Sequence, residues 1–246
     1  MAALLAAVSC STNPSWKPVE GHIMTRWAQD VNPSSPLPEY PRPAMVREGK
    51  WKNLNGLWDY AIVPAGEPAP DQFQGKILVP FAPESALSGV GMKVTPEDAL
   101  WYETSFSWKK GESTLLHFGA VDNEAQVWVN GELAGSHSGG YTGFTLDITP
   151  YLKPSGKQTV RVRVLDGSDN NRHPRGKQVL DPKGIWYTAL SGIWQTVWVE
   201  NVPAAHITGY EYTSDIVDGT ITVTVNANGG EEVEVSTEGV TATAKP

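Results

Sequence analysis

The residues best suited to chemistry in this sequence lie in one long polar stretch, residues 166–194, with the sequence DGSDNNRHPRGKQVLDPKGIWYTALSGIW. A sugar-binding site needs an aromatic face for the C–H side of the ring and forked polar groups for the hydroxyls. Trp186 and Tyr187 could supply the aromatic face. Four nearby polar residues could supply the hydrogen bonds: Arg175, Lys177, Gln178 and Asp181. Because long polar connections on a rigid scaffold are common sites of binding, we expect this loop to contact a ligand.

Each of these residues also has a purely structural explanation. Arg175 could pair with Asp166 or Asp169, Trp186 could plug the core, and the other side chains could face water. For any single residue the two explanations are equally good, so the prediction applies to the loop as a whole.

The other chemically interesting groups give weaker signals. The histidines are scattered, with no His-x-His or Glu-x-x-His spacing, so the spacing predicts no metal site and we expect no cofactor. His137 lies between Ser136 and Ser138, but a nucleophilic serine also needs an oriented base and oxyanion donors. Asp122 and Glu124 stand two apart beside a turn, where we expect them to cap the turn and face water.

The elements that position these residues are predicted to be short strands. The segment QTVRVRVL, residues 158–165, places three valines on one face and two arginines on the other, which is typical of a half-buried antiparallel strand. Asn130-Gly131 is a strong hairpin signal, because both residues tolerate the positive φ of a type I′ turn. No segment shows sustained helical periodicity, so the fold class is all-β.

Four segments are expected along the chain. Residues 46–203 form an antiparallel sandwich of the jelly-roll, galactose-binding-like type. Residues 204–246 begin an immunoglobulin-like sandwich that is truncated, with hairpin punctuation at residues 228–230. Residues 11–45 are an extended Pro/Ser-rich lead-in, and residues 1–10 resemble the remnant of a signal peptide.

The N-terminus and the charge suggest where the protein works. MAALLAAV followed by Ser9-Cys10 resembles a bacterial lipoprotein signal, in which Cys10 becomes acylated and attaches the exported protein to a membrane in the periplasm or outer membrane. The alternative is a disordered N-terminus with an unmodified thiol. The formal net charge of −8 argues against a nucleic-acid partner.

Five motifs, in order, carry a resemblance over residues 40–202 to the sugar-binding domain of glycoside hydrolase family 2, which includes β-galactosidases and β-glucuronidases. They are YPRPAMVREGKWKNLNGLWDYAI, VPFAPESALSGV, LWYETSF, FGAVDNEAQVWVNGELAGSHSGGYTGFTLDITPYL and SGIWQTVWVE. The resemblance implies a parent enzyme that hydrolyses β-linked glycans with two glutamates in a (β/α)₈ barrel. Such a barrel needs about 250 residues of its own. We therefore expect no catalytic residue in this chain and a missing C-terminal barrel as its partner.

The resemblance adds one site residue and one departure. Glu84, after VPFAP, falls in a loop on the side that faces the active site in this family, so we expect it near substrate. Family members carry a sugar-contacting aspartate just before the aromatic residue of the long loop, where this sequence has Gly184, and the nearest acid is Asp181. Two other functions stay open: an autonomous carbohydrate-binding module, and an adhesion or assembly sandwich.

Overall fold

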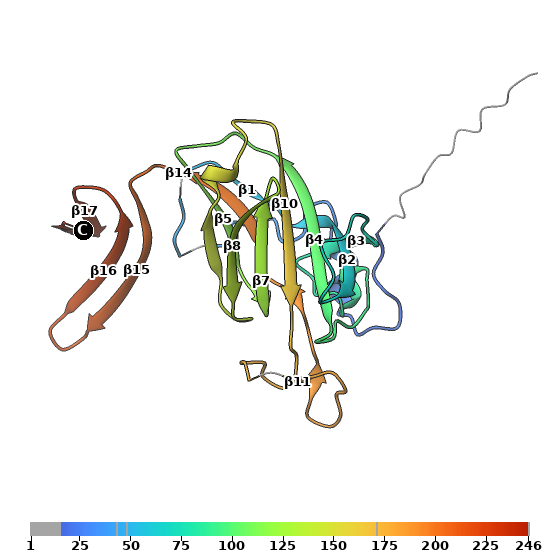
Figure 1. Cartoon of the computed structure of the whole chain (residues 1–246). Coiled ribbons are helices and arrows are strands. Elements are labelled where there is room, and N and C mark those ends of the chain that lie inside the picture. The colour runs from blue at the N-terminus through green and yellow to red at the C-terminus, as the bar shows by residue number, and fades with distance from the viewer. Residues whose placement is uncertain (1–15, 43, 48, 171, 246) are drawn as a thin grey trace, which may run out of the picture.

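The computed structural model describes residues 16–42, 44–47, 49–170 and 172–245, so Cys10 lies outside the described residues. The chain is all-β, and its main body is two antiparallel sheets packed face to face (Figure 1). The smaller sheet has the order β1 (Trp51–Asn53), β14 (Val197–Val202), β5 (Ser113–Phe118) and β9 (Phe144–Asp147). The larger has the order β3 (Gly75–Val79), β2 (Gly56–Pro64), β4 (Asp98–Ser107), β10 (Lys157–Leu165), β7 (Glu124–Val129) and β8 (Glu132–Ser138). The predicted all-β sandwich is confirmed.

The core lies between the two sheets, where strands of both contribute alternate apolar residues. Strand β10 shows the expected period of two: Val160, Val162 and Val164 are at most 1 % exposed, while Arg161 on the opposite face pairs with Glu103 at 2.6 Å. The β7–β8 hairpin turns at Asn130 and Gly131 with φ of 51° and 91°, as predicted. This hairpin is therefore scaffold.

Short elements complete the sandwich. The 3₁₀ turns are η1 (Arg26–Asp30), η2 (Ala86–Ser88) and η3 (Thr149–Tyr151). A small antiparallel pair joins β6 (Val121–Asp122) to β13 (Gly192–Ile193), and a small parallel pair joins β11 (Gln178–Val179) to β12 (Tyr187–Thr188). In the described part of the chain, no helix has the length and apolar character needed to span a bilayer.

Residues 11–45 were expected to be an extended lead-in; this segment includes the 3₁₀ turn η1, and side chains where it joins the sandwich pack against β14. Arg42 and Arg47 both form ion pairs with Glu200, which is 2 % exposed. Burial raises the pKa of Glu200, but the hydrogen bond from His117 and the charges of His117, Arg42 and Arg47 outweigh it and lower that pKa to about 2. The lead-in is thus fixed to β14 by a buried carboxylate.

Beyond β14 the chain forms two hairpins beside the sandwich, coloured red in Figure 1. The first pairs β15 (His206–Asp215) with β16 (Thr220–Asn228), and the second pairs β17 (Val233–Thr237) with β18 (Val240–Ala244). The turns therefore fall at residues 216–219 and 238–239, whereas Asn228 ends β16 and residues 229–232 connect the two hairpins. The hairpin predicted at residues 228–230 is wrong, because β16 pairs backward with β15 rather than forward with β17.

Candidate functional site

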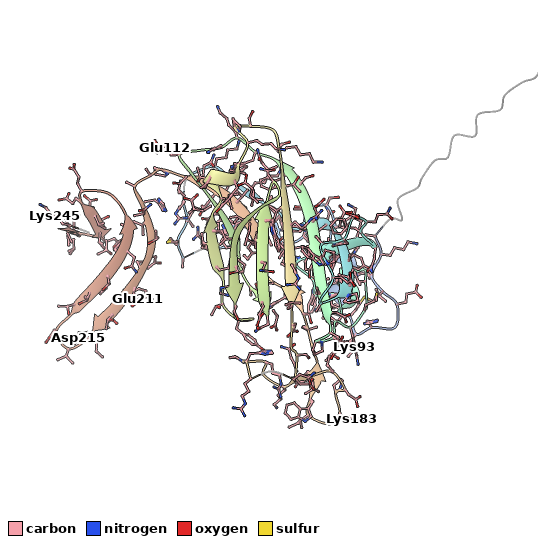
Figure 2. All side chains as sticks on the ribbon, in the orientation of Figure 1. Lys93, Glu112, Lys183, Glu211, Asp215 and Lys245 are labelled. Carbon is pink, nitrogen blue, oxygen red and sulfur yellow. The ribbon has the colours of Figure 1, made fainter. Side chains whose placement is uncertain are left out.

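The loop of residues 166–194 projects beyond one end of the sandwich. It leaves β10 and returns to the core at β13, and in Figure 1 its middle, marked by β11, hangs below both sheets. Figure 2 shows Lys183 at the outer end of this projection and Lys93 between it and the sandwich. Lys93 Nζ donates to the carbonyl of Leu180 at 2.5 Å, so a neighbouring loop helps to hold it. The loop that is predicted to bind a ligand therefore projects from the sandwich and is held at Leu180 by Lys93.

Both predicted aromatic residues lie on the surface of the projection. Trp186 is 45 % exposed and Tyr187 is 66 % exposed. The Tyr187 N–H donates to the carbonyl of Lys177 at 2.9 Å, which starts the parallel β11–β12 pair. The structural explanation of Trp186 as a core plug is wrong, and both aromatic side chains are available for stacking.

The predicted polar residues divide into two groups. Gln178 makes two structural hydrogen bonds, one outside the loop and one within it: its Nε2 donates to Tyr141 Oη at 3.0 Å, and its Oε1 accepts from the Leu190 N–H at 2.6 Å. Asp181 and Lys183 form an exposed ion pair at 2.8 Å, and Lys177 is exposed beside Tyr187. Arg175 is half-buried. Lys177 and Asp181 can therefore meet a ligand from solvent, whereas Gln178 holds the loop in place.

Glu84 is placed at the base of the projection rather than on its surface. Its side chain is 7 % exposed, and its two oxygens accept from the Val94 N–H at 3.3 Å and the Ser191 N–H at 3.1 Å. Burial raises the pKa of Glu84 to about 7 against the effect of these hydrogen bonds. Glu84 therefore fastens the end of the long loop to the segment that precedes β4.

A second buried polar cluster lies at the same base. Asp122 was expected to face water, and that is wrong: it is 5 % exposed, because β6 pairs with β13 at the inner end of the loop. Burial, with the nearby Asp166 charge, raises the pKa of Asp122 to about 7. Asp166, 4 % exposed, accepts from Ser191 Oγ and from the Ser168 N–H, each at 2.8 Å. His173 Nε2 lies 3.8 Å from Asp166 Oδ1.

Sequence reasoning missed this cluster because its members come from separate segments. Spacing rules test residues that are near one another in sequence, whereas here β6, the end of β10 and the long loop meet only through the sheet order. One signal in the sequence could have found the cluster, namely the position of its two aspartates relative to the strands. Asp122 and Asp166 both stand at strand ends, and β10 runs antiparallel to its neighbours β4 and β7.

A separate hollow of about 600 Å³ lies on the outer face of the larger sheet. It is lined by Trp101 and Trp128, whose ring centroids are 5.4 Å apart, and by the Glu103–Arg161 ion pair. Trp101 is only 4 % exposed, so Trp128 presents the more accessible indole. Sequence reasoning did not select this face.

Residues 90–203 match the model of the sugar-binding domain of glycosyl hydrolases family 2. The matched segment covers slightly less than half of the chain. A putative β-glucuronidase of Formosa agariphila is 35 % identical over an alignment 123 residues long, which covers 46 % of this chain and 14 % of that protein. A β-galactosidase of Thermoanaerobacter pseudethanolicus is 31 % identical over 118 residues, 47 % of this chain and 15 % of that protein. The matched region of the chain thus spans about one seventh of either relative.

Solved structures share the fold of most of this chain. A β-glucuronidase from Ruminococcus gnavus, in complex with N1-substituted uronic isofagomine, superposes with a TM-score of 0.60. The match covers 84 % of this chain and 40 % of that chain at 22 % identity. The long loop and the cluster of Asp122, Asp166 and His173 at its base both lie within the matched residues 90–203.

Proposed function

We propose that this chain is the N-terminal, non-catalytic part of a glycosidase that acts on β-linked glycans. Its relatives bear the names β-glucuronidase and β-galactosidase, and their sequences extend far beyond the matched region. In this proposal a barrel elsewhere in the protein carries the two catalytic glutamates. The sandwich supplies a rigid frame, and its long loop shapes the substrate site.

The observation that carries the proposal is the exposed aromatic end of the long loop. Trp186 and Tyr187 present their rings to solvent beside Lys177 and Asp181, on a projection whose base is fixed by Glu84. An aromatic face beside charged donors and acceptors is what a sugar ring requires. Asp181 is the acid nearest to the position of the family's sugar-contacting aspartate.

The test uses the complete product of the gene that encodes this chain and 4-nitrophenyl β-galactoside and β-glucuronide as substrates. We expect the complete product to hydrolyse at least one of them and this chain alone to hydrolyse neither. Trp186→Ala in the complete product should lower kcat/KM roughly tenfold, the effect of about 1.4 kcal/mol of lost stacking. Ile185→Ala is the matched control, because Ile185 is an exposed apolar neighbour on the same loop.

Two outcomes would contradict the proposal. If the complete product hydrolyses no β-glycoside, the proposed glycosidase activity is wrong. Equal kcat/KM for Trp186→Ala and Ile185→Ala would remove the loop from substrate recognition.

A second candidate function, an autonomous carbohydrate-binding module, is favoured by the hollow lined by Trp128 and the Glu103–Arg161 pair. If it holds, this chain alone binds oligosaccharides in isothermal titration and Trp128→Ala abolishes the binding. Binding that disappears in Trp186→Ala and survives in Trp128→Ala would instead support the glycosidase proposal.

We also propose that the protein is exported and attached to a membrane through an acylated Cys10. The support is the apolar run before Ser9-Cys10 and the polar tether after it. Mass spectrometry of the protein from its native cells should find diacylglyceryl-modified cysteine at the mature N-terminus. An unmodified N-terminus that still includes residues 1–9 would contradict this proposal.

A further inference from the structure

The buried cluster at the base of the long loop joins three groups that commonly ligate metal ions. Asp122 comes from β6, Asp166 follows β10, and His173 comes from the loop. One ligand atom from each lies within 4.8 Å of the others. Asp122 and Asp166 are 5 % and 4 % exposed. Two carboxylates so close together in a buried site repel each other, and a bound proton or a cation relieves that repulsion.

The cluster contains an acceptor whose hydrogen-bonding capacity is unused. Asp122 Oδ1 is buried and has no hydrogen-bond partner among the described residues. Leaving a buried carboxylate oxygen unsatisfied costs free energy, so such an atom points to a missing partner. Gly140 makes room for this carboxylate, because a Cβ at that position would lie 2.3 Å from Asp122 Oδ1.

The carboxylate of Asp166 is held in a fixed orientation by hydrogen bonds, as metal-binding carboxylates usually are. Its Oδ2 accepts from Ser191 Oγ, and its Oδ1 accepts from the Ser168 N–H while facing His173 Nε2 at 3.8 Å. Metal-ligating carboxylates are typically fixed by such outer hydrogen bonds. The Ser168 hydroxyl, which is also buried and unpartnered among the described residues, is a further oxygen near the cluster.

We propose that Asp122, Asp166 and His173 bind one divalent transition-metal ion, with Zn²⁺ as the representative of the class. Bonds of about 2.0–2.2 Å from Zn²⁺ to oxygen and nitrogen place tetrahedral ligand atoms roughly 3.4 Å apart. The separation of 3.8 Å between Asp166 Oδ1 and His173 Nε2 is already near that value. An imidazole beside two carboxylates favours Zn²⁺ over Ca²⁺, which prefers an all-oxygen set.

The ion links the sandwich to the projecting loop. Asp122 lies in β6, which is paired with β13 at the inner end of the loop, whereas His173 lies within the loop itself. A bond from each to the same ion holds the base of the loop closed and so fixes the segment that presents Trp186 and Tyr187. Metal binding to the native chain also raises its stability, because the unfolded chain does not preform the site.

The experiment measures Zn²⁺ and Ca²⁺ binding to this chain by isothermal titration, with elemental analysis, in a Cys10→Ser background that removes the thiol. We expect one Zn²⁺ per chain, bound at least tenfold more tightly than Ca²⁺. His173→Gln and Asp122→Asn should each weaken Zn²⁺ binding at least tenfold. Asp181→Asn is the matched control, because it removes an exposed carboxylate of the same loop and should leave the affinity unchanged.

The proposal is independent of sugar recognition, since metal binding is measured without any glycan. His173 is 14 % exposed, so His173→Gln decides the question if Asp122→Asn fails to fold. Failure of the wild-type chain to bind stoichiometric Zn²⁺ would overturn the proposal, and so would equal affinity in His173→Gln. Tighter binding of Ca²⁺ than of Zn²⁺ would overturn the proposed class of ion.

Discussion

The sandwich and the C-terminal hairpins contain strands of similar sequence pattern. The apolar side chains of these strands are buried in the sandwich and exposed or half-buried in the hairpins. In β10 of the sandwich the inward valines are at most 1 % exposed. In β16 of the hairpins the alternating run TITVTV leaves Ile221 66 % exposed and its valines half-buried. The strand pattern is the same in both, and only the sandwich strand has a second sheet over its apolar face.

This difference shows that an alternating pattern of apolar and polar residues predicts a strand but does not predict which element packs over its apolar face. A two-stranded hairpin gains little stability by itself, because most of the free energy comes from burying the apolar face. The hairpins expose Tyr212, Ile216 and Val217 at 71 %, 93 % and 89 %. We therefore expect the stability of the chain to depend on the sandwich far more than on the hairpins.

The largest expected contrast is between Trp58→Ala and Tyr212→Ala. Trp58 is 1 % exposed, donates to the Leu54 carbonyl at 2.8 Å and packs edge-on against Tyr102. Its removal should lower the free energy of unfolding by about 3–5 kcal/mol. Tyr212→Ala should change it by less than about 0.5 kcal/mol, since the ring is largely exposed. Urea titrations of both variants make the comparison, and similar losses would refute it.

A pH-dependent contrast is expected at Glu84. Its pKa is near 4.5 in the unfolded chain and about 7 in the fold, so the folded state holds a proton that the unfolded state releases. Stability should therefore be greatest below pH 4.5 and fall as the pH rises toward 7, by up to about 3 kcal/mol from this group. Urea titrations of Glu84→Gln at pH 5 and 8 should show a smaller fall than wild type.

The control at the surface is Asp59→Asn, which removes a half-exposed carboxylate paired with Lys76. Its fall in stability between pH 5 and 8 should match that of wild type. A Glu84→Gln variant with the same fall would show that the burial of Glu84 does not couple its proton to folding.

How much the sequence predicted depends on whether a feature is local. The strand of Val160, Val162 and Val164 and the turn at Asn130-Gly131 follow from periods and backbone preferences within a few residues, and both are confirmed. The burial of Asp122 depends on β13, seventy residues away, folding back over β6. No local pattern carries that information. The placement of Tyr187 likewise involves the β11–β12 pair, which is parallel and only two residues long.

Two glycines allow the effect of surroundings to be separated from backbone strain. Gly192 in the sandwich and Gly239 in the hairpins both have φ of +80°. A Cβ at Gly192 would lie 2.1 Å from Tyr102 Oη, whereas a Cβ at Gly239 would meet nothing within 4 Å. Both alanine variants carry the strain of about 1 kcal/mol, and Gly192→Ala adds roughly 1–3 kcal/mol of overpacking. Equal losses in thermal unfolding would mean that packing is as loose in the sandwich as in the hairpins.

The smallest effect is expected for Ile216→Ser at the tip of the β15–β16 hairpin. Because Ile216 is 93 % exposed, its replacement removes almost no buried area and should change the free energy of unfolding by less than about 0.5 kcal/mol. Unfolding measured at two protein concentrations tenfold apart sharpens the result. If the wild-type midpoint rises with concentration and the Ile216→Ser midpoint does not, copies of the chain cover the hairpins in solution. The apolar faces of both regions would then be buried. The second sheet would bury that of β10, and a second copy of the chain would bury that of the hairpins.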